Sequence, residues 1–159
     1  MTINVNECFP NVDFYHMTDS GPQSLKSAEL FKEKKILLVG VPGAFTPTCT
    51  EEHLPGYLKK IELFKEKGVE KIFFLAPNDP FVVKSWSENY EKSGIDFISD
   101  GNGDFREKSG FEIDLSAAGL GKRFSRFAML VEDGLVKQIF NEGNPGLDVS
   151  KAENVLDNI

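Results

Sequence analysis

The stretch that decides the fold is "KILLVGVPGAFTPTCTEEHLPGY", residues 35–57. Its first seven residues form a continuous apolar run with β-branched members, which predicts a buried strand of a parallel sheet. After Cys49, apolar residues recur at helical spacing as far as Gly68, which closes the segment. Pro55 is expected to end or kink the first turn of this helix. Cys49 is therefore expected between a buried strand and the start of a helix.

Two further strands follow along the chain, separated by another helix. The runs "KIFFLA" (71–76) and "IDFIS" (95–99) are predicted to be buried strands. Between them, Asp79 is a predicted N-cap and Pro80 occupies the first helical position of a segment that runs to Gly94. The order strand–helix–strand–helix–strand requires right-handed crossovers and predicts a parallel core.

The two ends of the chain predict antiparallel additions to this core. Residues 126–140 hold two apolar runs joined around Asp133–Gly134, which predicts a hairpin. Residues 149–159 predict a short terminal helix with one apolar face. Near the start, residues 3–5 and 12–17 are expected to form a small hairpin with each other. The sum is an α/β fold with a central mixed sheet flanked by helices on both faces.

Length, charge and cysteine count limit the class of protein. The 159 residues fit one domain, predicted to span 1–159. The net charge of −7 argues against a nucleic-acid partner, because phosphate binding needs clustered cations. No apolar run approaches the roughly 18 residues of a membrane span, and no signal peptide is recognisable. Two cysteines, Cys8 and Cys49, make no disulfide framework, so we expect a reducing compartment and a cytoplasmic protein.

The predicted position of Cys49 has two interpretations. Ligands of α/β sheets bind at the carboxyl ends of strands, and a helix start carries partial positive charge that favours a thiolate. The hydroxyl of Thr46, three residues earlier, can both donate and accept a hydrogen bond. Alternatively, Cys49 is a buried packing residue, which is the usual fate of a free cysteine. Position alone leaves both interpretations open.

A resemblance to a known family favours the reactive interpretation. The string "PGAFTPTC" fits Pro-x-x-x-Thr-x-x-Cys and resembles the active-site signature of peroxiredoxins. The longer string "VPGAFTPTCTEEHLPGY" and the later "NDPFVVKSW" are similar to the type-5 subfamily, and "ISDGNGDF" and "RFAMLVEDG" continue the match in order. The resemblance covers nearly the whole chain. It implies a thioredoxin-like fold and thiol-dependent reduction of hydrogen peroxide and organic hydroperoxides.

The same resemblance implies a role for each of four residues. Cys49 matches the peroxidatic cysteine, whose thiolate attacks one peroxide oxygen and becomes a sulfenic acid. Thr46 matches the threonine that contacts both sulfur and peroxide, and Pro42 matches the proline that shields the pocket from water. Arg126 matches the strand arginine that faces the cysteine. Thr46, Cys49 and Arg126 would together bind the peroxide.

Arg126 and His53 each have a plainer alternative. By sequence alone Arg126 could be surface charge, although in a strand it would share a face with Ala128 and Leu130. His53 lies four residues after Cys49, so one helical turn could bring a protonated imidazole to the thiolate. A satisfied packing histidine fits equally well. The two histidines and two cysteines show no metal-ligand spacing, so neither a metal nor a cofactor is predicted.

The resemblance leaves the thiol that reduces the sulfenic acid open. Some type-5 relatives carry a second cysteine near the C-terminus, but the matching segment here has Val149 near that place. Cys8 lies where the family has no resolving cysteine. We therefore expect a one-cysteine enzyme reduced by an external thiol, either glutathione with glutaredoxin or thioredoxin. A redox-sensing adaptor or a holdase on the same fold is the alternative. A homodimer through the active-site loops, around Phe45, is also expected.

Overall fold

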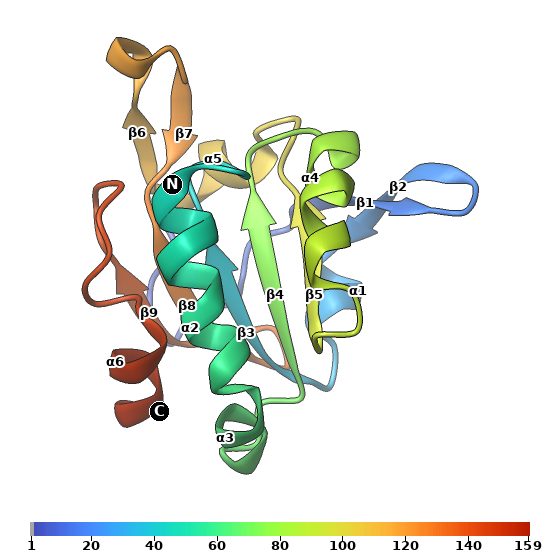
Figure 1. The fold of residues 1–159 in the computed structure, drawn as a ribbon. Coiled ribbons are helices and arrows are strands. Elements are labelled where there is room, and N and C mark those ends of the chain that lie inside the picture. Colours follow the sequence, from blue (N-terminus) through green and yellow to red (C-terminus); the bar gives the residue numbers. More distant parts are fainter. Residues whose placement is uncertain (1) are drawn as a thin grey trace.

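A seven-stranded mixed sheet runs through the molecule in the computed structural model, which describes residues 2–159 (Figure 1). Its spatial order is β2-β1-β5-β4-β3-β8-β9, and β6 and β7 form a separate pair. The strands are β1 (Asp13–Thr18), β2 (Gly21–Lys26), β3 (Lys35–Gly40), β4 (Lys71–Ala76), β5 (Ile95–Ser99), β6 (Glu112–Asp114), β7 (Lys122–Phe124), β8 (Phe127–Glu132) and β9 (Leu135–Asn141).

Short helices connect these strands. The α-helices are α1 (Ser27–Phe31), α2 (Leu54–Lys59), α3 (Ile61–Glu66), α4 (Pro80–Ser87), α5 (Asp104–Ser109) and α6 (Ala152–Asp157). A π-helical turn, Cys49–His53, precedes α2, and 3₁₀ turns cover Glu88–Tyr90 and Ser116–Ala118. The side chain of Asp79 caps α4 by accepting a 3.0 Å hydrogen bond from the backbone N–H of Val82, which confirms the predicted N-cap.

The predicted parallel core is confirmed. β3, β4 and β5 pair in parallel, and β8 joins β3 in antiparallel register with Gly40 opposite Phe127. β4 and β5 have the predicted bounds, and β3 ends one residue earlier than predicted. The predicted hairpin joins β8 and β9 through Asp133 and Gly134, whose φ angles of 47° and 79° are those of a tight hairpin turn.

Helices cover both faces of the sheet, which confirms the predicted fold class. Alternate β3 residues point to opposite faces, so Leu37 and Val39 enter one apolar cluster while Ile36 and Leu38 enter the other. The first cluster packs against α2, α3, α4 and α6 and contains Cys49. The second packs against α1 and α5, which lie behind the sheet in Figure 1.

The predicted N-terminal hairpin is wrong in its pairing. β1 does form a hairpin, but its partner is β2, which follows it, with Tyr15 opposite Ser24. The earlier residue Ile3 instead donates its N–H to the carbonyl of Ser109 at the end of α5. β2 reads GPQSLK, with little apolar content, because it is a mostly exposed edge strand. Such a strand has no hydrophobic alternation by which the sequence could reveal it.

The helix after Cys49 also differs from its prediction. Pro55 does not end the helix, since it lies at the start of α2 and the chain before it is already helical. The turn before Pro55 is π-helical instead, with the N–H of Leu54 bonded to the carbonyl of Cys49. A wider turn absorbs the proline, which lacks an N–H and crowds the preceding turn. The actual break falls at Lys60, between α2 and α3.

The segment between α5 and β8 forms a hairpin that the sequence did not predict. β6 and β7 pair with Glu112 opposite Phe124 and project beyond the main sheet (Figure 1). Each strand has only three residues, which is too short for a periodicity signal. This hairpin leads directly into Arg126 and β8.

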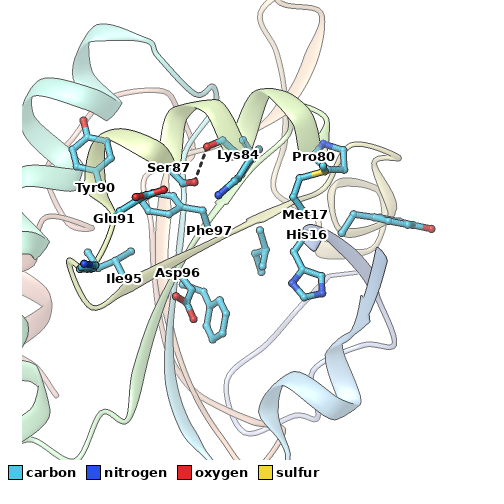
Figure 2. A pocket seen from close by; sticks show the side chains of 15 residues that line it. His16, Met17, Pro80, Lys84, Ser87, Tyr90, Glu91, Ile95, Asp96 and Phe97 are labelled. Carbon is cyan, nitrogen blue, oxygen red and sulfur yellow. Dashed lines mark hydrogen bonds between the residues drawn. The ribbon is translucent and has the colours of Figure 1, made fainter. Parts of the chain in front are cut away.

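A cavity of about 350 Å³ lies between β1, β5 and α4 (Figure 2). Among the described residues, β1 and β5 pair through a single bridge, Tyr15 to Ser99, so the two strands diverge beside the cavity. None of the lining residues belongs to the segment around Cys49. Separately, within residues 2–159 no helix is long and apolar enough to cross a membrane. The prediction of one domain over 1–159 stays a prediction.

Candidate active site

The loop after β3 brings Cys49 to the carboxyl end of the parallel strands. Its backbone is fixed to the neighbouring β4 segment, because the N–H of Val41 donates to Leu75 and that of Ala44 to the side chain of Asn78, at 2.9 and 2.8 Å. Phe45 then adopts a φ of 64°, which is unusual for a residue other than glycine. The chain becomes helical at residue 47, so Cys49 lies in the first helical turn, as predicted.

Two polar side chains meet the sulfur of Cys49, which is fully buried. The hydroxyl oxygen of Thr46 lies 2.8 Å from Sγ, and Nη2 of Arg126 lies 3.1 Å from it. The Thr46 oxygen also lies 2.7 Å from the carbonyl of Gly43. A hydroxyl has one proton, so it can donate to a thiolate or to this carbonyl, but not to both at once. The structure thus brings together three residues that the resemblance assigned to one site.

Arg126, the residue directly before β8, is a buried cation, only 1% exposed. Besides Sγ, its guanidinium reaches Nδ1 of His53 at 2.9 Å and the carbonyl of Pro145 at 3.3 Å. Among residues 2–159, no carboxylate forms an ion pair with it. A buried charge is stable only when it is paired, so a thiolate on Cys49 is the counter-ion that this geometry provides. The alternative of a surface arginine does not fit.

His53 is buried and faces Arg126 rather than the sulfur. Burial, and next the positive charge of Arg126, lower its pKa to about 3, so the imidazole is neutral at physiological pH. Its Nε2 lies 3.2 Å from the carbonyl of Ser150, which can only accept. Nε2 therefore carries the proton, and Nδ1 accepts from Arg126. The hypothesis of a protonated imidazole beside the thiolate is wrong, and the alternative of a satisfied histidine fits.

The loop from Glu142 to Ser150 contacts the backbone of Arg126. The N–H of Arg126 donates to Asn144 at 3.2 Å, and its carbonyl accepts from the N–H of Glu142 at 2.9 Å. The carboxylate of Glu142 in turn accepts from the N–H and the hydroxyl of Ser150, at 2.9 and 2.7 Å. Burial acts to raise the pKa of Glu142, but hydrogen bonds from the loop outweigh it and leave the pKa lowered. Glu142 therefore holds the loop in place as an anion.

The sequence did not reveal the contribution of this loop. Glu142, Pro145 and Ser150 lie in irregular backbone, and two of them act through backbone groups, so neither residue type nor periodicity identifies them. Pro42, which the resemblance did assign to the site, is buried two residues after the end of β3. Its carbonyl accepts a 2.8 Å hydrogen bond from Arg123. Among the residues described, no three His, Cys, Asp or Glu side chains gather where they could hold a metal ion.

Comparison with known proteins identifies the family to which this chain belongs. A family profile described as Redoxin matches residues 4–156. The chain belongs to the Redoxin family. It is 40% identical over 157 residues to Peroxiredoxin-2B of Arabidopsis thaliana, which covers 97% of this chain and 96% of that protein.

Two solved peroxiredoxins are similar in structure as well. Reduced Prx3 of Vibrio vulnificus in complex with hydrogen peroxide has a TM-score of 0.92 at 37% identity, covering 98% of each chain. Peroxiredoxin 5 of Alvinella pompejana has a TM-score of 0.85 at 30% identity, covering 97% of this chain and 96% of that one. This Redoxin family member is thus a peroxiredoxin of the type-5 kind, with a thioredoxin-like fold and thiol peroxidase activity.

Proposed function

We propose that Cys49 is the peroxidatic cysteine and that Thr46, Arg126 and Pro42 complete the site. The observation that carries the proposal is the double contact on one buried sulfur, from the Thr46 hydroxyl and the Arg126 guanidinium. The guanidinium of Arg126 is proposed to stabilise the thiolate and the negative charge that develops during the reaction. Pro42, buried in the loop that carries Cys49, is proposed to keep water from the pocket.

The proposed first half of the reaction cycle oxidises Cys49 and reduces the peroxide. The Cys49 thiolate attacks one oxygen of hydrogen peroxide or an organic hydroperoxide, so an S–O bond forms as the O–O bond breaks. The leaving oxygen takes a proton and departs as water or an alcohol, and the sulfur becomes a sulfenic acid. The Thr46 hydroxyl can accept from the peroxide while donating to sulfur, which aligns the reacting atoms. Substrate oxygen is reduced and Cys49 is oxidised.

A one-cysteine cycle is proposed because Cys8 lies at the other end of the sheet. Cys8 bridges to Leu135, beside the β8–β9 turn at the amino end of β3, whereas Cys49 follows the carboxyl end of β3. The six residues of β3 span roughly 16 Å at about 3.3 Å per residue. A disulfide needs Cα atoms within about 6–7 Å. Val149 offers no thiol at the place where some relatives carry one.

An external thiol is therefore proposed to reduce the sulfenic acid, with glutathione and glutaredoxin preferred and thioredoxin second. One thiol forms a mixed disulfide with Cys49 and releases water, and a second thiol frees Cys49 and leaves as a disulfide. Because Sγ is fully buried, the helical turn that carries it must open to admit this thiol. Trp86, the one tryptophan of the chain, donates to the hydroxyl of Thr50 at 3.2 Å and would report this opening.

A homodimer through the active-site loops is also proposed. Phe45 is 50% exposed next to the site, and Phe81, in the first turn of α4, is 63% exposed. The hydrogen bond from Ala44 to Asn78 joins the loop to the residues just before α4. A Phe45→Glu variant should therefore shift the sedimentation of the protein from dimer to monomer. A cytoplasmic location is proposed because both cysteines are free, as a reducing compartment keeps them.

Steady-state turnover with each reductant tests the proposal. Purified protein is given hydrogen peroxide with glutathione and glutaredoxin, or with thioredoxin and its reductase, and the Cys8→Ser variant serves as the control for the second thiol. Turnover that survives in Cys8→Ser supports the one-cysteine cycle. A Cys8→Ser variant that loses turnover, although Cys49 is still oxidised once by hydrogen peroxide, would contradict it. Oxidation of Cys49 without turnover, with capture of a partner as a mixed disulfide, would favour a sensor or holdase.

A further inference from the structure

A second arginine, Arg123 of the β6–β7 hairpin, contacts the loop that carries Cys49. Arg123, on β7, is partly buried, and its Nη1 donates to the carbonyl of Pro42 at 2.8 Å. Its Nε donates to the carbonyl of Leu120 at 2.8 Å. One planar guanidinium thus joins two backbone carbonyls, one in the hairpin and one in the loop that carries Cys49. Among residues 2–159, no carboxylate forms an ion pair with Arg123.

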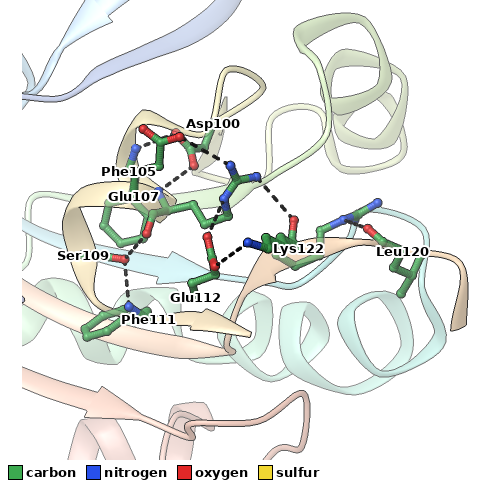
Figure 3. Close-up of polar contacts among 10 residues, drawn as sticks. Asp100, Phe105, Glu107, Ser109, Phe111, Glu112, Leu120 and Lys122 are labelled. Atoms are coloured by element: carbon green, nitrogen blue, oxygen red, sulfur yellow. Dashed lines mark hydrogen bonds and ion pairs between the residues drawn. The ribbon is translucent and has the colours of Figure 1, made fainter. Parts of the chain in front are cut away.

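The hairpin that carries Arg123 is fixed at its base. Figure 3 shows the polar contacts around Glu112 and Lys122, on the two paired strands, where Oε1 of Glu112 lies 3.7 Å from Nζ of Lys122. The carboxylate of Glu112 lies 3.1 Å from Nε of Arg106, on α5, and Nη1 of Arg106 lies 3.4 Å from the carbonyl of Lys122. Strand β6, through Glu112, and helix α5, through Arg106, therefore both contact β7. Arg123 reaches the loop from this hairpin.

The contact with Pro42 lies on a short path to the reacting sulfur. Proline has no N–H, so its carbonyl is the one backbone group through which Pro42 can be held. The next residue, Gly43, leaves room for the guanidinium, since a Cβ there would lie 3.1 Å from Nη1 of Arg123 and 3.0 Å from the methyl group of Thr46. The carbonyl of Gly43 in turn contacts the Thr46 hydroxyl. Arg123 and Thr46 thus pack against the same glycine.

We infer that Arg123 is a positioning residue for peroxide reduction, which holds the Pro42–Thr46 turn so that the Thr46 hydroxyl meets both sulfur and peroxide. The inference rests on the proposed role of Cys49. Arg123 acts through Pro42 and Gly43 and does not itself touch the sulfur. Small displacements of a positioning group cost large factors in rate, so its loss should slow the reaction with peroxide.

The test compares two reactions of the same thiol. Alkylation by iodoacetamide needs a thiolate and access, whereas peroxide reduction also needs an aligned Thr46. In Arg123→Gln, single-turnover oxidation by hydrogen peroxide, followed by intact mass, should slow roughly ten- to a hundredfold. Alkylation should stay within about twofold of wild type. The control is Lys137→Gln, which removes an exposed cation on β9 that takes no part in the contacts of the hairpin and should leave both rates within about twofold.

Arg123→Lys keeps the test decisive if the glutamine variant does not fold. A lysine can donate to Pro42 but cannot join both carbonyls, so its peroxide rate should fall severalfold with alkylation unchanged. Equal losses in both reactions, or a folded variant with an unchanged peroxide rate, would overturn the inference. A wild type that oxidises no faster than an ordinary thiol would overturn the role of Cys49 as well. A fast wild type with an unaffected Arg123→Gln variant would overturn the role of Arg123 alone.

Discussion

The two cysteines of this chain lie in opposite environments. Cys8 is exposed and pairs through its backbone with Leu135, at the amino end of β3. Cys49 is fully buried beyond the carboxyl end of the same strand, with a hydroxyl and a guanidinium on its sulfur. Exposure alone would name Cys8 as the reactive thiol. The contacts support the proposal that Cys49 is the reactive thiol, because a hydroxyl and a guanidinium on one sulfur would stabilise a thiolate and align a peroxide.

The comparison supports the proposal that the reactivity of a cysteine in this protein depends on fixed polar partners rather than on exposure to solvent. Arg126 gains its position from three directions: the sulfur, His53 and the carbonyl of Pro145. Of these three partners, only the sulfur can carry a negative charge, because the imidazole of His53 and the carbonyl of Pro145 are neutral. The protein thus holds a buried cation whose natural complement is the reactive form of the cysteine.

The largest expected effect comes from exchanging the two sulfurs for oxygen one at a time. Cys49→Ser should lower peroxide consumption by a factor on the order of 10³ or more, because no other thiol lies in the site. Cys8→Ser should stay within about twofold of wild type. Peroxide consumption is followed by a colorimetric peroxide assay. Strong loss in Cys8→Ser would reverse the comparison.

The next largest effect should come from Arg126. Arg126→Gln removes the cation, and we expect the second-order rate constant for peroxide to fall about 10²- to 10³-fold, as when a donor to developing charge is lost. Arg126→Lys should lose much of the rate as well, because an ammonium cannot reach the sulfur, His53 and Pro145 together. Stopped-flow fluorescence of Trp86 measures the rate. A Gln variant as fast as wild type would mean that the buried charge has no part in the reaction.

Thr46 should give a smaller effect. Thr46→Val keeps the shape of the side chain and removes the hydroxyl, so the peroxide rate should fall roughly ten- to a hundredfold. Thr46→Ser keeps the hydroxyl and should stay within severalfold of wild type. Thr48→Val, two residues later in the first helical turn, is the matched control and should have little effect. If Thr48→Val and Thr46→Val lost the same rate, a general disturbance of the turn would explain both.

Substitution of His53 should change how the free energy of unfolding depends on pH. Its folded pKa of about 3 lies below the ordinary value of 6.5, so the unfolded chain takes up the proton first. Its contribution to stability is therefore complete above pH 6.5 and is lost as pH falls toward 3. In His53→Gln, the free energy of unfolding should fall less over this range, with His16→Gln as the comparison variant. Chemical denaturation at several pH values measures it, and identical slopes in the two variants would refute the assignment.

The sequence predicted the parts of this molecule that carry strong local signals. The three parallel strands, the capped helix at Asp79 and the β8–β9 hairpin each have an apolar pattern or a turn signal. The edge strand β2 and the short β6–β7 pair have neither. For the site, a specific motif gave Cys49 and Thr46. Glu142, Pro145 and Arg123 each make a hydrogen bond in which one partner is a backbone group, and such contacts leave no trace in residue spacing.

One experiment uses the two cysteines as internal controls for each other. Reduced wild-type protein receives one equivalent of hydrogen peroxide in the presence of dimedone, which traps sulfenic acids, and peptide mass mapping then locates the label. If fixed polar partners create the reactive thiol, nearly all of the label will lie on the buried Cys49 and almost none on the exposed Cys8. Label on Cys8, or an equal division between the two, would contradict the central claim.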